Sequence, residues 1–70
     1  MGWIHVGGPL DGMDGNTDDV AASIGMEAKF NQDLDEWTIT KYEADRRVSS
    51  WKYQIYAGEM VCMESVFEEL

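Results

Sequence analysis

The chain has 70 residues, with 14 Asp and Glu against 5 Lys and Arg, so its formal net charge is −9. We predict one compact domain over residues 1–70, because a chain of this length is too small for a cleft between two lobes. A hydrophobic content of 44% with three tryptophans indicates a folded protein rather than a disordered acidic tail. The negative charge repels phosphates, which argues against direct binding of nucleic acid or anionic membranes.

Cysteine usage suggests a reducing compartment. Cys62 is the only cysteine and His5 the only histidine, so they predict neither an intrachain disulfide nor a structural zinc site. Residues 1–6 lack the basic flank and apolar run of a signal peptide, and no run approaches the roughly 18 apolar residues that cross a bilayer. We expect a cytoplasmic protein without a cofactor.

The first half of the chain predicts a strand, a turned loop and a helix. Residues 3–6 are a short apolar run, which indicates an edge strand. Residues 7–16 are rich in Gly and Asp and contain the only proline, which is typical of tight turns. A helix is predicted over 17–24, since Asp18 and Asp19 suit its first turn and Gly25 suits its end.

The second half predicts mainly strands, over 26–30, 36–42, 51–56 and 61–64, with a hairpin turn at Ala57 and Gly58. Residues 41–49 match a helix that begins with a capping box, while a turn at 45–46 is the alternative. The fold class is therefore α+β, a small antiparallel sheet of three to five strands with one or two short helices. The predicted core consists of Ile4, Val20, Ile24, Phe30, Trp37, Ile39, Val48, Trp51, Tyr53, Ile55, Val61 and Met63.

Three chemical patterns in the sequence fall short of a predicted site. Asp14, Asn16 and Asp18 match the first calcium ligands of an EF-hand loop, but the required Gly and the final Glu are missing. The glycine-rich segment 7–12 has no Lys to hold a phosphate. His5 and Cys62 could meet across a sheet, yet no third group would orient them. We expect neither a metal site nor enzymatic activity.

The acidic residues predict a binding surface. Asp33, Asp35 and Glu36 crowd one loop and repel each other, Glu64 faces outward on the last hairpin, and Glu68 and Glu69 extend that negative edge. Carboxylates spaced like phosphates can pair with the Arg and Lys groove of a nucleic-acid-binding protein. An ordinary solvated surface is the alternative. Trp3, near the terminus, is predicted to be an exposed anchor for a partner.

Residues 5–12, His-Val-Gly-Gly-Pro-Leu-Asp-Gly, resemble a class of small bacteriophage proteins of uncertain function. The resemblance implies a short strand followed by a structural turn and later by aromatic-rich strands such as residues 51–56. The chain departs from that pattern in its acidic loop, residues 14–19. In size and charge it is also similar to anti-CRISPR and other anti-defence inhibitors, several of which mimic DNA.

Two functions follow from these features. The first is a non-enzymatic phage inhibitor, a monomer or dimer, that blocks the basic groove of a host nucleic-acid-binding protein such as a CRISPR effector subunit. The second is a structural or assembly protein that self-associates through exposed aromatic residues, with its acidity serving solubility.

Overall fold

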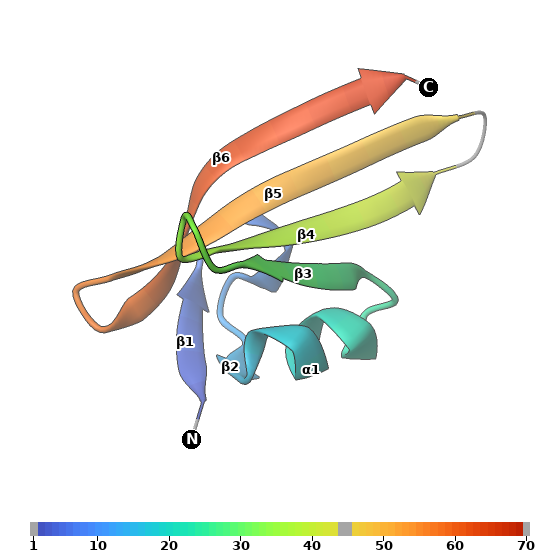
Figure 1. Cartoon of the computed structure of the whole chain (residues 1–70). Helices are drawn as coiled ribbons and strands as arrows, with labels where there is room; N and C mark the ends of the chain where they lie inside the picture. The colour runs from blue at the N-terminus through green and yellow to red at the C-terminus, as the bar shows by residue number, and fades with distance from the viewer. Residues whose placement is uncertain (1, 44–45, 70) are drawn as a thin grey trace.

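A computed structural model describes residues 2–43 and 46–69. Within these ranges the chain forms one six-stranded sheet, one α-helix and a short 3-10 turn (Figure 1). The elements in chain order are β1 (Trp3–Val6), η1 (Gly8–Leu10), β2 (Asp14–Gly15), α1 (Thr17–Ser23), β3 (Glu27–Asn31), β4 (Glu36–Glu43), β5 (Arg47–Tyr56) and β6 (Glu59–Glu69).

The strands lie in the order β2-β1-β6-β5-β4-β3. Strands β3 to β6 form an antiparallel meander, whereas β1 pairs parallel to β6 through His5 with Met60 and Val6 with Val61. The expectation of an antiparallel sheet with three to five strands is thus wrong in strand number and in the direction of β1. A local pattern identifies a strand, but the sheet edge that it joins depends on long-range packing.

The predicted helix over 41–49 is wrong for its described residues. Strand β4 continues to Glu43 and β5 begins at Arg47, with Tyr42 opposite Val48, while residues 44–45 lie outside the described ranges. The capping-box pattern is a weak local preference, and pairing with neighbouring strands on both sides of β5 overrides it.

The helix and the last hairpin are confirmed. Helix α1 begins at Thr17, with Asp18 and Asp19 in its first turn. Strands β5 and β6 are joined by Ala57 and Gly58, whose φ angles of 52° and 79° are both positive. Two positive φ angles are the signature of a type I′ turn, which matches the twist of a two-residue hairpin.

The buried core is small and lies mainly on one face of the sheet, where residues of α1 and η1 pack against β4, β5 and β6. Its fully or nearly fully buried apolar residues are Leu10, Val20, Ala21, Ile39, Tyr53 and Met60. Five residues predicted for the core are instead exposed: Ile4, Ile24, Phe30, Ile55 and Met63. One seven-residue helix and a short loop cover too little of a six-stranded sheet to bury every alternating apolar position.

The tryptophans all contribute to this core. Trp3, Trp37 and Trp51 are half-buried and pack against the buried cluster. The prediction that Trp3 is an exposed anchor is therefore wrong, because β1 lies inside the sheet between β2 and β6 and holds the indole against the core.

Candidate binding surface

The glycine-rich turn at residues 7–12 is built around the hydroxyl group of Tyr53. This hydroxyl donates a hydrogen bond to the carbonyl oxygen of Gly7 at 2.5 Å and accepts one from the backbone N–H of Leu10 at 3.1 Å. A Cβ atom at Gly8 would overlap the same hydroxyl. Asp11 closes the turn by accepting a hydrogen bond from the Gly7 N–H at 2.8 Å. The segment therefore acts as a structural turn.

Burial sets the protonation chemistry of this region. Loss of solvent raises the pKa of Tyr53, although the hydrogen bond from Leu10 opposes the rise and the nearby Cys62 and Asp11 add to it. Burial likewise raises the pKa of Cys62. Both shifts favour the protonated forms, the thiol of Cys62 and the phenol of Tyr53.

His5 is a buried connector between β1, the following loop and α1. Its Nδ1 donates to the carbonyl oxygen of Met13 at 2.9 Å, since a carbonyl can only accept. In the neutral ring Nε2 then accepts from the Thr17 hydroxyl, also at 2.9 Å. The Cys62 thiol instead points to the carbonyl oxygen of Glu64, 3.6 Å away. Both ring nitrogens are engaged elsewhere, so His5 and Cys62 do not form a base–nucleophile pair.

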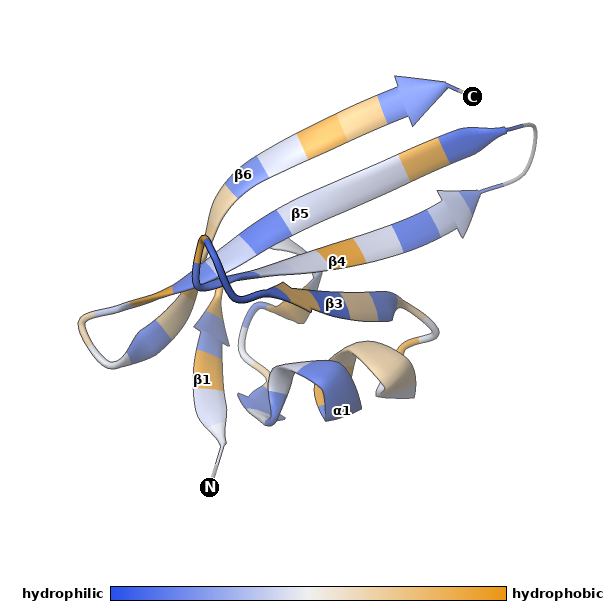
Figure 2. Cartoon of the chain, in the orientation of Figure 1, coloured by the Kyte–Doolittle hydropathy of each residue, from blue (hydrophilic) through white to orange (hydrophobic). Residues whose placement is uncertain are grey.

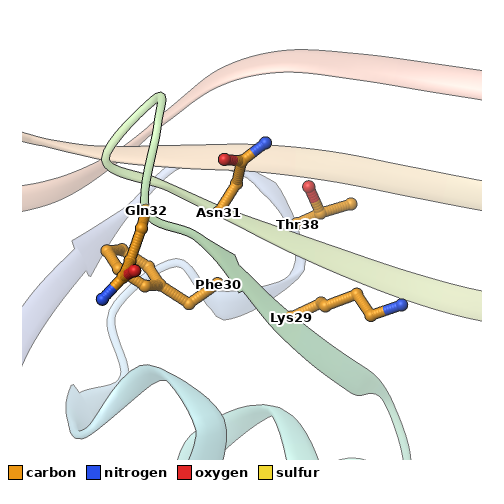
Figure 3. A pocket seen from close by; sticks show the side chains of 5 residues that line it. All are labelled: Lys29, Phe30, Asn31, Gln32 and Thr38. Carbon is orange, nitrogen blue, oxygen red and sulfur yellow. The ribbon is translucent and has the colours of Figure 1, made fainter.

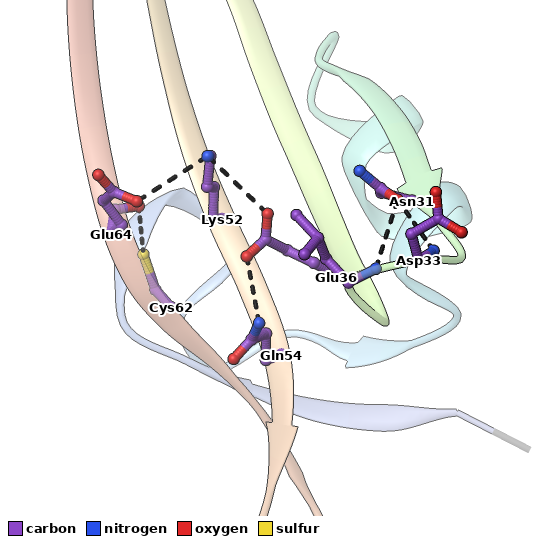
Figure 4. A network of polar contacts seen from close by, with 8 residues as sticks. Asn31, Asp33, Glu36, Lys52, Gln54, Cys62 and Glu64 are labelled. Carbon is purple, nitrogen blue, oxygen red and sulfur yellow. Dashed lines mark hydrogen bonds and ion pairs between the residues drawn. The ribbon is translucent and has the colours of Figure 1, made fainter.

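Two of the predicted site residues, Glu36 and Glu64, are brought together by Lys52 of the central strand β5 (Figure 4). The Lys52 Nζ lies 3.9 Å from a carboxylate oxygen of each. Glu36 also accepts a hydrogen bond from the Gln54 amide at 3.2 Å. The Glu36 side chain is only 12% exposed and that of Glu64 58% exposed, so Glu64 is the more accessible carboxylate.

Asp33 and Asp35 lie in the tight turn between β3 and β4. The Asp33 N–H donates to the Asn31 side-chain oxygen at 3.0 Å, and Asp35 has a positive φ of 51°. Aspartate tolerates that left-handed conformation better than most residues, which gives Asp35 a local structural role. Both are exposed residues.

The last two predicted residues lie on opposite faces of β6. Glu68 is opposite Val48, on the same face as Glu64, whereas Glu69 is opposite Arg47 on the other face. Glu69 and Arg47 form a long ion pair of 3.9 Å. The six predicted residues therefore do not form a single patch. Glu36, Glu64 and Glu68 lie on one face of the sheet, Glu69 lies on the other face, and Asp33 and Asp35 lie in the turn.

A second acidic group precedes and begins α1. Asp14, Asp18 and Asp19 are all exposed, and no side-chain hydrogen bond caps the helix. Their sequence positions predict turn residues and helix-capping carboxylates. Their density in residues 14–19 is the signal that could have identified them as part of the acidic surface.

A hollow lies at the β3 edge of the sheet, over β3 and β4 (Figure 3). It has a volume of about 570 Å³ and is lined by Lys29, Phe30, Asn31, Gln32 and Thr38. Lys29 is the only charged residue of this lining, and Phe30 packs on Trp37 with ring centroids 5.2 Å apart.

Residues 2–43 and 46–69 place no group of three or more His, Cys, Asp or Glu side chains close enough to hold a metal ion. In the same ranges no helix has the length and apolar character needed to span a membrane. Comparison of the chain with protein-family models, with curated proteins and with solved structures finds no match.

Proposed function

We propose that this protein is a non-catalytic inhibitor that binds the basic, nucleic-acid-binding surface of another protein, with carboxylates in the place of phosphates. The supporting observation is the distribution of its few cations. Lys41, Arg47 and Lys52 each lie beside a carboxylate of the same sheet, at 3.7–3.9 Å. Each of these three cations is balanced by a neighbouring carboxylate, so the exposed acids of the β3–β4 turn, of the start of α1 and of β6 carry the surplus negative charge.

The resemblance of residues 5–12 to phage proteins supports a specific setting for this activity. The partner would be a host defence protein that binds nucleic acid, such as a CRISPR effector subunit, in the cytoplasm of the bacterial host. Such a partner already has Arg and Lys side chains arranged for phosphates, and carboxylates form strong charge-assisted hydrogen bonds with them. A monomer or dimer of this protein is sufficient for that mode of inhibition.

Competition with nucleic acid tests this proposal. Proteins captured from the host by the tagged chain are purified and assayed for release of labelled DNA or RNA as this protein is added. We expect release at low salt and weaker competition as ionic strength rises, because screening shortens the reach of charges to about 8–10 Å. Capture of a protein whose nucleic-acid binding is unchanged by saturating inhibitor would contradict the proposal.

Two double charge-reversal variants locate the acidic surface that binds the partner. Asp33→Lys with Asp35→Lys should weaken competition more than Glu27→Lys with Glu59→Lys, which makes the same change in net charge at other exposed positions. An equal loss for both pairs would show that only net charge matters. Glu36 is left out of the reversal because its contacts with Lys52 and Gln54 are also structural. Because Asp35 has a positive φ, unchanged thermal unfolding of both double variants is required as a control for the fold.

The second candidate, self-association, is favoured by a different observation. Tyr42, Tyr56 and Phe67 are 67%, 68% and 61% exposed, so three aromatic side chains are accessible to another copy of the chain. An assembly protein would form large species at micromolar concentration in analytical ultracentrifugation. A monomer or dimer that fails to grow with concentration would exclude this candidate.

A further inference from the structure

The outer edge of β6 is the longest open strand edge of the described chain. Strand β1 covers β6 only at Met60 and Val61, after which the chain leaves the sheet at Gly7. On its inner side β6 stays paired with β5 as far as Glu69. Figure 1 shows this half of β6 at the upper border of the sheet, with β5 on its inner side and no described strand on its outer side. Its outward backbone groups are thus available to another chain.

The open edge is regular. A bulge at Met63 separates it from the part that β1 covers, since Tyr53 pairs with Cys62 and Lys52 with Glu64. From Glu64 to Glu69 the register with β5 then runs without interruption. Such a stretch spans roughly 20 Å, at about 3.3 Å per residue, which is long enough to seat an added strand.

The side chains along this edge combine an apolar centre with carboxylates. Alternation puts Glu64, Val66 and Glu68 on one face, and Phe67 with Glu69 on the other. Figure 2 shows the short apolar stretch of residues 66–67 between hydrophilic neighbours. An added strand would therefore meet apolar contact at its middle and negative charge toward both ends.

A second copy of this chain is disfavoured in the register that would pair the two apolar centres. Antiparallel pairing of two β6 strands about Val66 would put Glu64 of each copy opposite Glu68 of the other. Like charges directly opposite each other destabilise a strand pair. The same carboxylates favour a strand with cations at matching positions, so charge selects a basic occupant.

We propose that residues 64–69 of β6 accept an extended segment of a basic partner as an additional β-strand. Two cationic side chains four residues apart would lie opposite Glu64 and Glu68, with an aliphatic residue between them opposite Val66. Backbone hydrogen bonds supply the affinity of such strand addition, and alternate side chains supply its specificity. This inference rests on the proposed function for the basic character of the partner, and it adds how the partner binds.

A hollow at the start of the open edge extends the site. It lies where β1 leaves β6, has a volume of about 270 Å³, and is lined by Gly8, Trp51, Cys62, Met63, Glu64 and Ser65. One side chain from the end of the added strand can enter it. Trp51 lies opposite Ser65, on the face of the sheet away from the Glu64 side chain, and its ring can offer a cation–π contact to a cationic side chain there.

The probe is the acetylated and amidated peptide Thr-Lys-Thr-Val-Thr-Lys-Thr, added to the whole protein and followed by amide NMR. Its sequence reads the same in both directions, so it tests parallel and antiparallel addition together. We expect chemical-shift changes and slower amide exchange at alternate residues of 64–69. A peptide with Pro in place of the central Val keeps the charge but cannot complete the ladder, and it should bind at least tenfold more weakly.

Matched variants test the role of the carboxylates. Glu64→Gln with Glu68→Gln should weaken peptide binding by roughly two- to thirtyfold, from two lost cross-strand charge pairs. Glu27→Gln with Glu59→Gln makes the same change in net charge elsewhere, and it should leave the peptide affinity within about twofold of the wild type. Unchanged thermal unfolding of both variants shows that the fold is intact.

Three results would overturn strand addition. The first is peptide binding that protects amides of α1 or of the turn at 32–35 from exchange. That result would not contradict the proposal of a basic partner. The second is equal binding of the Pro-containing peptide. The third is a dimer of the free protein whose contact maps to residues 64–69. Failure of the proposed function itself is seen separately, as a captured partner whose nucleic-acid binding does not change.

Discussion

The hydroxyl of Tyr53 occupies the space that a side chain at Gly8 would need, and the two residues lie 45 positions apart in the chain. The same hydroxyl holds the turn through Gly7 and Leu10. Gly8 also has a positive φ of 62°. The glycine-rich turn therefore depends on β5, because the Tyr53 hydroxyl both fills the space beside Gly8 and holds the turn backbone.

This relationship predicts coupling between two substitutions. Gly8→Ala should destabilise the protein by about 2–4 kcal/mol, from the left-handed backbone and the overlap with Tyr53. Tyr53→Phe should cost about 1–3 kcal/mol, because the buried Leu10 N–H loses its partner. Removal of the hydroxyl relieves the overlap, so the double variant should be less destabilised than the sum by more than about 0.5 kcal/mol. Strict additivity in urea unfolding would contradict the packing described.

Stability should fall in alkaline solution. The pKa of Cys62 is raised above its ordinary value of 9.0 and that of Tyr53 above 10.0. Between the unfolded and folded pKa values the unfolded state binds fewer protons, so the free energy of unfolding decreases as pH rises. The contribution of both groups is complete below about pH 9 and is lost progressively above it.

Urea unfolding between about pH 8 and pH 11 measures this dependence. Tyr53→Phe should keep only the loss of stability that begins near the ordinary cysteine pKa of 9.0. Cys62→Ser should keep only the loss of stability that begins near the ordinary tyrosine pKa of 10.0. A Tyr53→Phe variant with the full wild-type slope above about pH 10 would show that Tyr53 does not contribute.

The buried contact between His5 and Thr17 supplies a third prediction. Thr17→Val removes the hydroxyl that satisfies Nε2 and leaves a buried polar atom without a partner, which should cost about 1–3 kcal/mol. Thr17→Ser keeps the hydroxyl and should cost much less. Thermal unfolding of the two variants provides the comparison, and equal losses would mean that the methyl group, not the hydrogen bond, is what matters.

The hairpin turn offers a stabilising change. Ala57 has a φ of 52° in a type I′ turn, a conformation that Asn or Gly adopts at lower cost. Ala57→Asn should raise the stability by about 0.4–1 kcal/mol, whereas Gly58→Ala at φ 79° should lower it. A denaturation midpoint that drops for Ala57→Asn would contradict the turn assignment.

Lys52 supplies a prediction that links stability to binding. Lys52→Gln removes the cation between Glu36 and Glu64 and makes the net charge one unit more negative. The ion pairs are long and partly exposed, so the stability loss should be no more than about 1 kcal/mol. Binding of the lysine peptide should strengthen, since Glu64 becomes free to pair with it. Weaker binding in isothermal titration would show that Lys52 orders the site rather than masks it.

Local patterns in the sequence are sufficient to predict several elements. The Gly and Pro content of residues 7–12 predicts a turn, Asp18 and Asp19 predict the start of α1, and Ala57-Gly58 predicts the hairpin. Each signal acts within one turn of chain, where φ preference, helix-end electrostatics and side-chain alternation determine the backbone. The helix prediction over 41–49 is wrong because the local helix pattern there is weaker than the pairing of β4 with β5.

Other features depend on contacts between distant residues and were decided only by the tertiary structure. Alternation shows that a strand has two faces, but it does not show which strand lies beside it. The parallel pairing of β1 with the first residues of β6 leaves the outer edge of 64–69 open. Lys52 brings Glu36 and Glu64 together across three strands, and Tyr53 reaches back to Gly7. Strand order and register follow from packing of the whole sheet, because no local sequence pattern encodes which distant strand gives the best burial.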